Sequence, residues 1–352
     1  MIILGIESSC DETGVAIVKN GTTLLANSLA SSMEMHKIYG GVVPEIAARS
    51  HIEAIIPTVE NALDQFTKNY PNFSREQIWD HIDGIAVTYG AGLSGSLLIG
   101  VLTARTLAIT KNKPLYAINH VEAHVYANFL TEPLPQFPIL ALIVSGGHTQ
   151  LVLFKNHFNY ILLGQTHDDA IGEAFDKVAK ILGLPYPGGP SVETYAKDGN
   201  PLAYPLPIAK VDGDYNFSFS GPKTAVLRAA QAAVGADYHL PSTALPERLT
   251  KAQKHDIAAS FQQTALQTVI TKTLKAYKQY NPKTVVIAGG VAASQKLRDT
   301  LKDQLPIDIT YAPKNLCTDN GAMVATLGCY KAMLGAKQAD PYTLAIQPNL
   351  SM

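Results

Sequence analysis

The chain has 352 residues, 47% of them hydrophobic and only 16% charged, a composition that can bury a large core and that excludes intrinsic disorder. Its length favours two domains of roughly 100–200 residues each. With 28 lysines and arginines against 29 aspartates and glutamates, the net charge is -1, which excludes binding of nucleic acid through overall charge alone.

The first half of the chain begins with short predicted strands joined by polar turns. Polar residues from Glu7 to Gly14 separate the first two strands, and Lys19-Asn20-Gly21 separates the second from the third. In chain order the predicted elements are strands at 2–6, 15–18 and 23–26, a helix at 44–63, a strand at 83–88, a helix ending near Ile109, a strand at 115–118 and a helix starting near His120.

The second half begins in the same way. A polar turn, Ser145 to Thr149, follows its first strand, and Lys155-Asn156-His157 joins the next two. In chain order the predicted elements are strands at 139–144, 151–154 and 160–163, helices at 171–182 and 254–278, a strand at 284–288, a helix ending at Leu301, a strand at 307–311 and a helix starting near Thr318.

This repetition predicts an internal duplication. The fold class is therefore α/β, with two similar lobes at 1–134 and 135–317 and a central cleft at the carboxyl ends of their strands. A loop-rich insertion, rich in proline and glycine, is expected at about 204–250. A helix at about 318–345 is expected to pack back onto the first lobe.

The helix predicted after the strand 115–118 begins with two histidines. His120 and His124 are four residues apart, so they share one helix face and can bind one metal ion. Taken alone, this spacing fits packing or surface histidines better, but its position directly after a buried strand favours a site in the cleft. Glu122 faces away, unlike the Glu next to the first His in metalloproteases. Asp319 holds the matching position in the second copy. A site of two histidines and one aspartate with open positions suits Fe(II) or Zn(II).

The polar turns after the first strand of each copy are candidates for binding phosphate. Ser8, Ser9 and Asp11 lie in the first turn, and 145–149 form the second. Small residues let backbone N–H groups approach phosphate closely, and hydroxyl groups add donors. Either turn alone is typical of an ordinary hairpin, whereas their duplication favours a phosphate clamp.

Glycine-rich turns follow two other buried strands, but they are less specific signals for nucleotide binding. Gly289-Gly290 permits flat approach of a nucleoside, although a plain strand-to-helix turn needs the same small residues. Gly90, Gly92 and Gly95 fit GxGxxG, but no acidic residue ends the following strand, which argues against a dinucleotide site. The sequence contains no GxxxxGK[S/T] motif, which excludes a P-loop enzyme.

Six motifs together resemble the TsaD/Kae family, the tRNA N6-adenosine threonylcarbamoyltransferases once called O-sialoglycoprotein endopeptidases. The similarity runs from Ile3 to about Thr326 and is closest to the bacterial pattern. It implies the duplicated actin-like, sugar-kinase-like fold (ASKHA, RNase H-like). The motifs are 5–13 (GIESSCDET), 40–45 (GGVVPE), 120–124 (HVEAH), 144–149 (VSGGHT), 217–221 (FSFSG) and 289–293 (GGVAA).

The resemblance also implies roles for single residues. His120, His124 and Asp319 match the family's metal ligands. Together with Ser9 from the first polar turn, the residues expected to bind substrate are Ile143, Val144, Ser145, Gly146, Gly147, Asp176, Gly189, Glu193 and Ser294. Two departures stand out, because Ser294 replaces the usual Asn that contacts the adenylate and Pro222 replaces the usual Leu.

The implied activity is transfer of a threonylcarbamoyl group from threonylcarbamoyl-AMP to N6 of the adenosine 3′ of the anticodon, in tRNAs that read codons beginning with A. One divalent ion per subunit, Fe(II) or Zn(II), would activate the carbonyl. Asp11 is the candidate for accepting the N6 proton, and a binding role for it stays open. The alternatives are a metal-independent, ATP-dependent small-molecule kinase or an ATP-binding chaperone of the same fold, neither of which needs the His pair.

The near-zero net charge makes the chain alone a poor platform for tRNA. The resemblance implies a TsaB-like paralogue and a TsaE-like ATPase as partners, and a TsaC-like synthase that makes the adenylate. In the helix 44–63, Ile52, Ile55 and Ile56 form one apolar ridge. Ala47, Ala48 and Ala54 keep other parts of the helix surface small, which permits close approach of another helix. Either the ridge simply packs on the sheet of its own lobe, or part of this helix surface docks the TsaB-like paralogue.

The cysteines and the apolar segments predict a cytoplasmic protein that does not enter a membrane. Cys10, Cys317 and Cys329 are widely spaced and form no CxxC pair, which is typical of a reducing compartment. The first residues lack the basic and long apolar regions of a signal peptide. The most apolar later stretch, 93–109, is too polar for a membrane span of about 20 residues.

Overall fold

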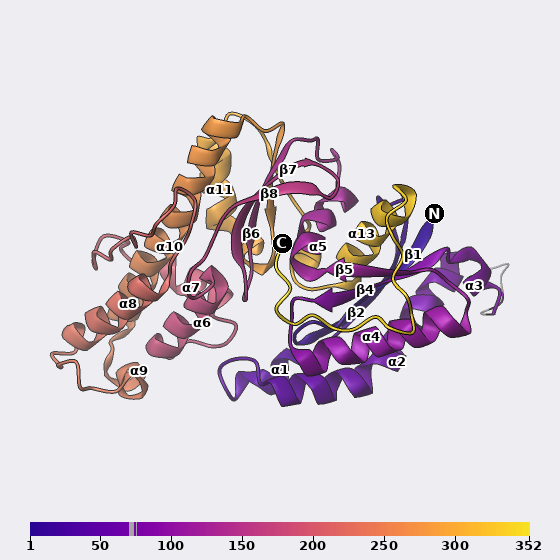
Figure 1. Ribbon diagram of the computed structural model, residues 1–352. Helices are drawn as coiled ribbons and strands as arrows, with labels where there is room; N and C mark the ends of the chain where they lie inside the picture. Colours follow the sequence, from indigo (N-terminus) through magenta and orange to yellow (C-terminus); the bar gives the residue numbers. More distant parts are fainter. Residues whose placement is uncertain (70–73, 75) are drawn as a thin grey trace. The chain divides into compact units, whose positions relative to one another are not determined.

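The computed structural model describes residues 1–69, 74 and 76–352 (Figure 1). These residues form two compact units. The first unit comprises Met1–Pro135 and Tyr311–Met352, and the second comprises Gln136–Thr310. Each unit contains a five-stranded sheet covered by helices.

The sheet of the first unit has the strand order β3-β2-β1-β4-β5. Its strands are β1 (Ile2–Glu7), β2 (Glu12–Lys19), β3 (Thr23–Ser31), β4 (Gly84–Gly90) and β5 (Leu115–Asn119). Strand β1 pairs antiparallel with β2 and parallel with β4. The carboxyl ends of β1, β4 and β5 therefore meet at one edge of the sheet, where Glu7, Thr88 and Asn119 lie.

Helices of the first unit cover both faces of this sheet. They are α1 (Met33–Lys37), α2 (Pro44–Asn69), α3 (Ile78–His81), α4 (Ser94–Thr110), α5 (His120–Tyr126), α12 (Lys314–Cys317) and α13 (Gly321–Met333). On one face, Leu4 and Ile6 pack into the core with side chains of α2 and α4. Residues alternate between the faces of a strand, so Gly5 faces the opposite side, where α13 lies. A Cβ atom on Gly5 would lie 2.3 Å from Ala325 N, so this close approach requires glycine.

The sheet of the second unit repeats the first. Its order is β10-β9-β6-β7-β8, which becomes the order of the first sheet when β6 to β10 are matched with β1 to β5. The strands are β6 (Ile139–Val144), β7 (Thr149–Asn156), β8 (Asn159–Gln165), β9 (Thr284–Ala288) and β10 (Ile309–Tyr311), and the α-helices are α6 (Ile171–Leu182), α7 (Gly188–Ala196), α8 (Ser220–Ala233), α9 (Leu245–Arg248), α10 (Lys251–Tyr280) and α11 (Gln295–Gln304). The predicted duplication is confirmed.

Two details differ from the sequence-based expectation. The helix expected near Thr318 begins at Gly321, because Asn320 is extended and its side chain accepts a hydrogen bond from Met323 N at 3.0 Å, which caps α13. A short helix, α12, precedes it, so Asp319 lies in a linker between two helices and does not open a helix after a strand. The segment 204–250 contains the helices α8 and α9 besides irregular stretches.

No helix within the described residues has both the length and the apolar character needed to cross a lipid bilayer.

Residues 339–352 run along the first unit as an extended strap (Figure 1, yellow). Arg105 on α4 anchors the strap with three side-chain hydrogen bonds, from Nε to Pro341 O and from Nη2 to Tyr342 O, each 2.6 Å, and from Nη1 to Leu344 O at 3.3 Å. Farther along, Gln347 N donates to Tyr89 O at 2.7 Å. Arg105 therefore holds the first part of the strap, while backbone hydrogen bonds such as that from Gly92 N to Pro348 O and the packing of Leu344 and Ile346 on the core also attach it.

We predict that Arg105→Ala loosens the strap without unfolding the unit. Hydrogen bonds from a charged donor contribute about 1.5–3 kcal/mol each, and this side chain is partly exposed, so we expect the free energy of unfolding to fall by about 1–3 kcal/mol in total. Amide hydrogen exchange at Gln347 should become faster. Arg105→Lys keeps the charge but has fewer donors. Its exchange rate at Gln347 should lie between those of the wild type and of Arg105→Ala. Unchanged exchange in the alanine variant would show that the strap is held elsewhere.

Candidate metal centre and substrate loops

The helix α5 starts at a position set by its capping residue. Asn119 ends β5 in an extended conformation, and its Oδ1 accepts hydrogen bonds from Val121 N at 2.9 Å and Glu122 N at 3.2 Å. These bonds satisfy two of the free N–H groups of the first turn. As a result His120 and His124 project from the first turns of α5, and their ring centroids lie 4.7 Å apart.

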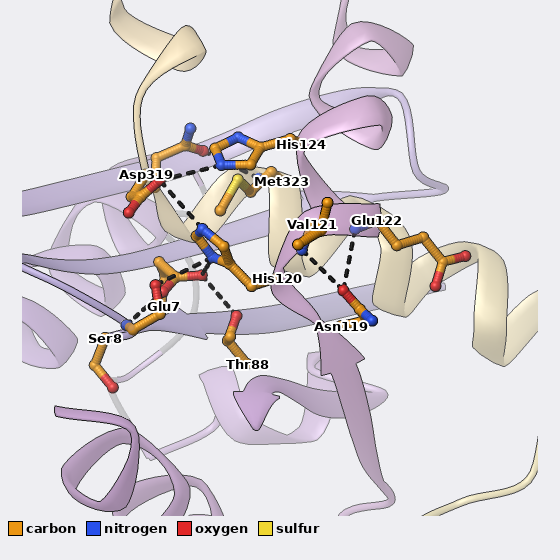
Figure 2. Close-up of polar contacts among 12 residues, drawn as sticks. Glu7, Ser8, Thr88, Asn119, His120, Val121, Glu122, His124, Asp319 and Met323 are labelled. Atoms are coloured by element: carbon orange, nitrogen blue, oxygen red, sulfur yellow. Dashed lines mark hydrogen bonds and ion pairs between the residues drawn. The ribbon is translucent and has the colours of Figure 1, made fainter. Parts of the chain in front are cut away.

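Asp319 completes a cluster with the two histidines (Figure 2). Its Oδ1 lies 3.2 Å from His124 Nε2 and 3.6 Å from His120 Nε2. One ligand atom from each of the three side chains lies within 4.8 Å of the others, so they could together hold a metal ion. Within the described part of the chain, neither buried ring nitrogen of His124 has a hydrogen-bond partner. A metal ion between Nε2 and the Asp319 carboxylate would bind a ring nitrogen that makes no hydrogen bond with the described residues, so these residues fit the group that the sequence predicts.

A fourth side chain, Glu7, belongs to this centre, and the sequence analysis did not single it out. It ends β1 and is 0% exposed. Its Oε1 accepts from Ser9 N at 2.6 Å, and its Oε2 accepts from Thr88 Oγ1 at 2.6 Å and lies 3.2 Å from His120 Nδ1. The available signal was an acidic residue at the end of an otherwise apolar strand, which cannot be buried without donors around it.

The charges of the centre favour a cation between its carboxylates. Burial alone would lower the pKa of His120, but the charges of Asp319 and Glu7 outweigh it and raise the pKa to about 9. Burial likewise tends to raise the pKa of Glu7, and the interaction with His120 outweighs it, so that the pKa of Glu7 lies below its usual value. At pH 7 a proton on His120 therefore occupies the place that a divalent ion would take.

The turn between β1 and β2 places Asp11 and Glu12 in the same acidic surroundings. The Asp11 carbonyl accepts from Ser32 N at 3.0 Å and Ser32 Oγ at 2.9 Å, which fixes the turn. Burial, followed by the charges of Asp319 and Asp11, raises the pKa of Glu12 to about 10. Glu12 is therefore uncharged at neutral pH, and its neighbour Asp11 remains the candidate for accepting a proton. Ser9 is buried in this turn, with its Oγ 3.1 Å from His120 Nδ1.

The loop expected to approach phosphate lies in the second unit. Ile143 and Val144 are buried at the end of β6, and a turn is closed by hydrogen bonds from Ser145 N to His148 O at 2.8 Å and from His148 N to Ser145 Oγ at 3.1 Å. At the tip, the backbone of 146–147 is exposed, and no heavy atom lies within 4 Å of the position of an added Cβ. The tip is therefore open to a ligand.

The remaining predicted substrate residues form two pairs in the second unit. Asp176 Oδ1 accepts from Gly188 N at 2.6 Å, which places it beside the turn that leads to Gly189. Glu193 Oε1 accepts from Ser294 Oγ at 3.2 Å. The Ser294 hydroxyl also accepts from Leu297 N and caps α11, so serine here serves as a helix cap.

A protein-family model described as tRNA N6-adenosine threonylcarbamoyltransferase, TsaD, matches residues 23–326. The chain belongs to the TsaD family. A relative from Thermomicrobium roseum is 45% identical over 96% of this chain and 93% of its own length, and one from Symbiobacterium thermophilum is 46% identical with the same two coverages. A third, from Dehalococcoides mccartyi, is 42% identical over 100% of this chain and 99% of its own. All three are named tRNA N6-adenosine threonylcarbamoyltransferase.

Solved structures with low sequence identity share the fold. Full-length HypF in its phosphate- and nucleotide-bound form has a TM-score of 0.59 at 12% identity, covering 94% of this chain and 55% of that one. Component A of the (R)-2-hydroxyglutaryl-CoA dehydratase of Acidaminococcus fermentans has a TM-score of 0.51 at 17% identity, covering 95% of this chain and 99% of that one. The predicted duplicated actin-like, sugar-kinase-like fold is thereby confirmed.

Proposed function

We propose that the protein transfers the threonylcarbamoyl group from threonylcarbamoyl-AMP to N6 of the adenosine 3′ of the anticodon, in tRNAs that read codons beginning with A. The observation that carries this proposal is the cluster of His120, His124 and Asp319 in a chain that matches the TsaD family over residues 23–326. A small-molecule kinase or an ATP-binding chaperone of the same fold would have no use for a buried pair of histidines beside an aspartate.

The donor set of two imidazoles and one carboxylate suits one Fe(II) or Zn(II) ion with open coordination positions. When bound, such an ion acts as a Lewis acid toward the carbamoyl carbonyl and the departing phosphate. The chain itself contributes the orientation of the ligands, because Asn119 fixes the start of α5 and Asn320 fixes the linker that carries Asp319.

The other groups prepare the two substrates for reaction. An exocyclic adenine amine is a poor nucleophile, because its lone pair is delocalised into the ring, so it must be held against the carbonyl and must lose a proton. Asp11 takes this proton in our proposal, since Glu12 is uncharged at neutral pH. Backbone N–H groups of 146–147 bind the phosphate, since the N–H of Ser145 already donates to His148 O. Asp176, Gly189, Glu193 and Ser294 hold the nucleoside.

The transfer reaction can be tested with the purified protein. The protein is loaded with Fe(II) or Zn(II), supplied with its partner proteins, and mixed with threonylcarbamoyl-AMP and unmodified tRNA. We expect AMP release and threonylcarbamoyladenosine in the tRNA, in amounts that follow the metal content. A metal-loaded, folded protein that released no AMP, or one that phosphorylated small molecules from ATP, would contradict the proposal.

We also propose that the first lobe docks a TsaB-like paralogue in the cytoplasm, and that a TsaE-like ATPase and a TsaC-like adenylate synthase act with it. The apolar ridge of α2 divides in the structure. Ile55 is 5% exposed and belongs to the core, whereas Ile52 and Ile56 are 58% and 68% exposed. Only Ile52 and Ile56 are therefore exposed to a partner. The family resemblance implies that this partner is the TsaB-like paralogue.

We predict that Ile56→Glu abolishes binding of the TsaB-like paralogue, because the interface would have to bury an unpaired charge. The side chain is exposed in the isolated chain, so the melting temperature and the metal content should be nearly unchanged. Ile208→Glu is the matched control, since Ile208 is an isoleucine of the second unit that is 49% exposed. Co-elution of the two proteins during size-exclusion chromatography measures binding. If Ile56→Glu co-eluted as well as the control, the docking surface would lie elsewhere.

A further inference from the structure

The fully buried carboxylate of Glu7 contacts three polar groups from three different segments. Ser9 N binds one oxygen, and the Thr88 hydroxyl and His120 Nδ1 meet the other. Figure 2 shows His120 between Glu7 on one side of its ring and Asp319 on the other. Burying a carboxylate in this way is costly unless its oxygens are satisfied, and here both are.

We propose that Glu7 is a positioning residue that holds the His120 ring with Nδ1 as the hydrogen-bond donor and Nε2 directed at the metal position. This inference rests on the proposed metal centre. A neutral imidazole carries its proton on only one nitrogen. Since an ionised carboxylate can only accept, Nδ1 must be the protonated atom, and the lone pair of Nε2 is left to bind a metal ion.

The contacts of Glu7 also explain why a neutral isostere should orient His120 less well. A glutamine has one acceptor oxygen and one NH2 donor. In Glu7, Oε1 accepts from Ser9 N and Oε2 accepts from the Thr88 hydroxyl. An amide NH2 at the first position would face Ser9 N–H, which cannot accept. At the second position it would face His120 Nδ1, which could accept only by moving the ring proton to Nε2. That tautomer blocks the metal-binding nitrogen.

The decisive measurement is the dissociation constant for Zn(II) of the full-length protein, determined by competition with a chelator. Loss of a partner behind a metal-binding histidine usually weakens metal affinity roughly 10–100-fold, and we expect this loss for Glu7→Gln. The 15N shifts of His120 in the Zn(II)-loaded wild type should show a protonated Nδ1 and a metal-bound Nε2. Circular dichroism verifies that each variant is folded.

Glu122→Gln is the matched control. Glu122 is also a buried glutamate, it lies on α5 two residues after His120, and its side chain points away from the metal position (Figure 2). Its Oε1 atom has no hydrogen-bond partner among the described residues, so the substitution breaks no hydrogen bond of that oxygen. Its Zn(II) affinity should equal that of the wild type.

Thr88→Val tests whether Glu7 acts by orienting the His120 ring or only through its negative charge. It removes the hydroxyl that pins Oε2 but leaves the carboxylate of Glu7 in place. A positioning role predicts a several-fold weaker affinity, whereas a purely electrostatic role predicts no change. Because valine has nearly the shape of threonine, this variant also decides the matter if Glu7→Gln does not fold.

The outcomes distinguish this inference from the proposed function. If His124→Ala loses Zn(II) while Glu7→Gln behaves like Glu122→Gln, Glu7 does not position His120 and the metal centre stands. If Glu7→Gln weakens binding but Thr88→Val does not, Glu7 acts through its charge and the positioning role is wrong. If His124→Ala binds Zn(II) as tightly as the wild type, the metal centre itself is misassigned and the inference falls with it.

Discussion

Replacing His124 with alanine is expected to remove the bound metal ion and nearly all transferase activity. Loss of a residue that merely supports a ligand costs roughly 10–100-fold in metal affinity, so loss of one of only three protein ligands should cost more than about 100-fold. The ring is buried, and its removal leaves a cavity. It also removes two buried nitrogen atoms for which the described residues provide no hydrogen bond, which offsets part of that cost. The protein should therefore stay folded.

Metal content by elemental analysis and formation of threonylcarbamoyladenosine by mass spectrometry test this expectation together. His239→Ala is the control, because His239 is an exposed histidine of the second unit. The control should retain wild-type metal content and activity. A His124→Ala protein with full metal content and full turnover would place the metal on other residues.

Asp11→Asn is expected to slow the chemical step at unchanged metal content. Asparagine keeps the size of the side chain and one acceptor oxygen, but it cannot take up the proton that N6 must lose. A positioned general base contributes about 100–10,000-fold to a rate, so kcat should fall by at least about 100-fold while KM for the adenylate changes little.

Glu12→Gln is the matched control for Asp11→Asn. The pKa of Glu12 is raised to about 10, so this adjacent carboxyl group is already neutral at pH 7, and the amide should have a much smaller effect on kcat. Steady-state kinetics at saturating tRNA separate the two parameters. A rise in KM at unchanged kcat would make Asp11 a residue that binds substrate.

Local patterns were enough to predict most elements and the duplication. The helix 171–182 and the strand 284–288 have the predicted bounds, because short apolar runs between turn residues define strands and a 3.6-residue period defines helices. The position of the His pair was also predicted, since its helix follows directly after a buried strand. The start of α13 was not, because the side chain of Asn320, and not the pattern of apolar residues, sets it.

The strands, most of the helices, the two copies and the helix face that carries His120 and His124 can thus be predicted from local patterns. Which distant residues meet at that face depends on how the elements pack. Glu7 and His120 are 113 positions apart, and they meet because β1, β4 and β5 end at one edge of the sheet. The tertiary structure likewise decided that Ile55 is core while Ile52 and Ile56 are exposed. Apolar periodicity defines a face of one element, but burial depends on how far the neighbouring elements extend over that face.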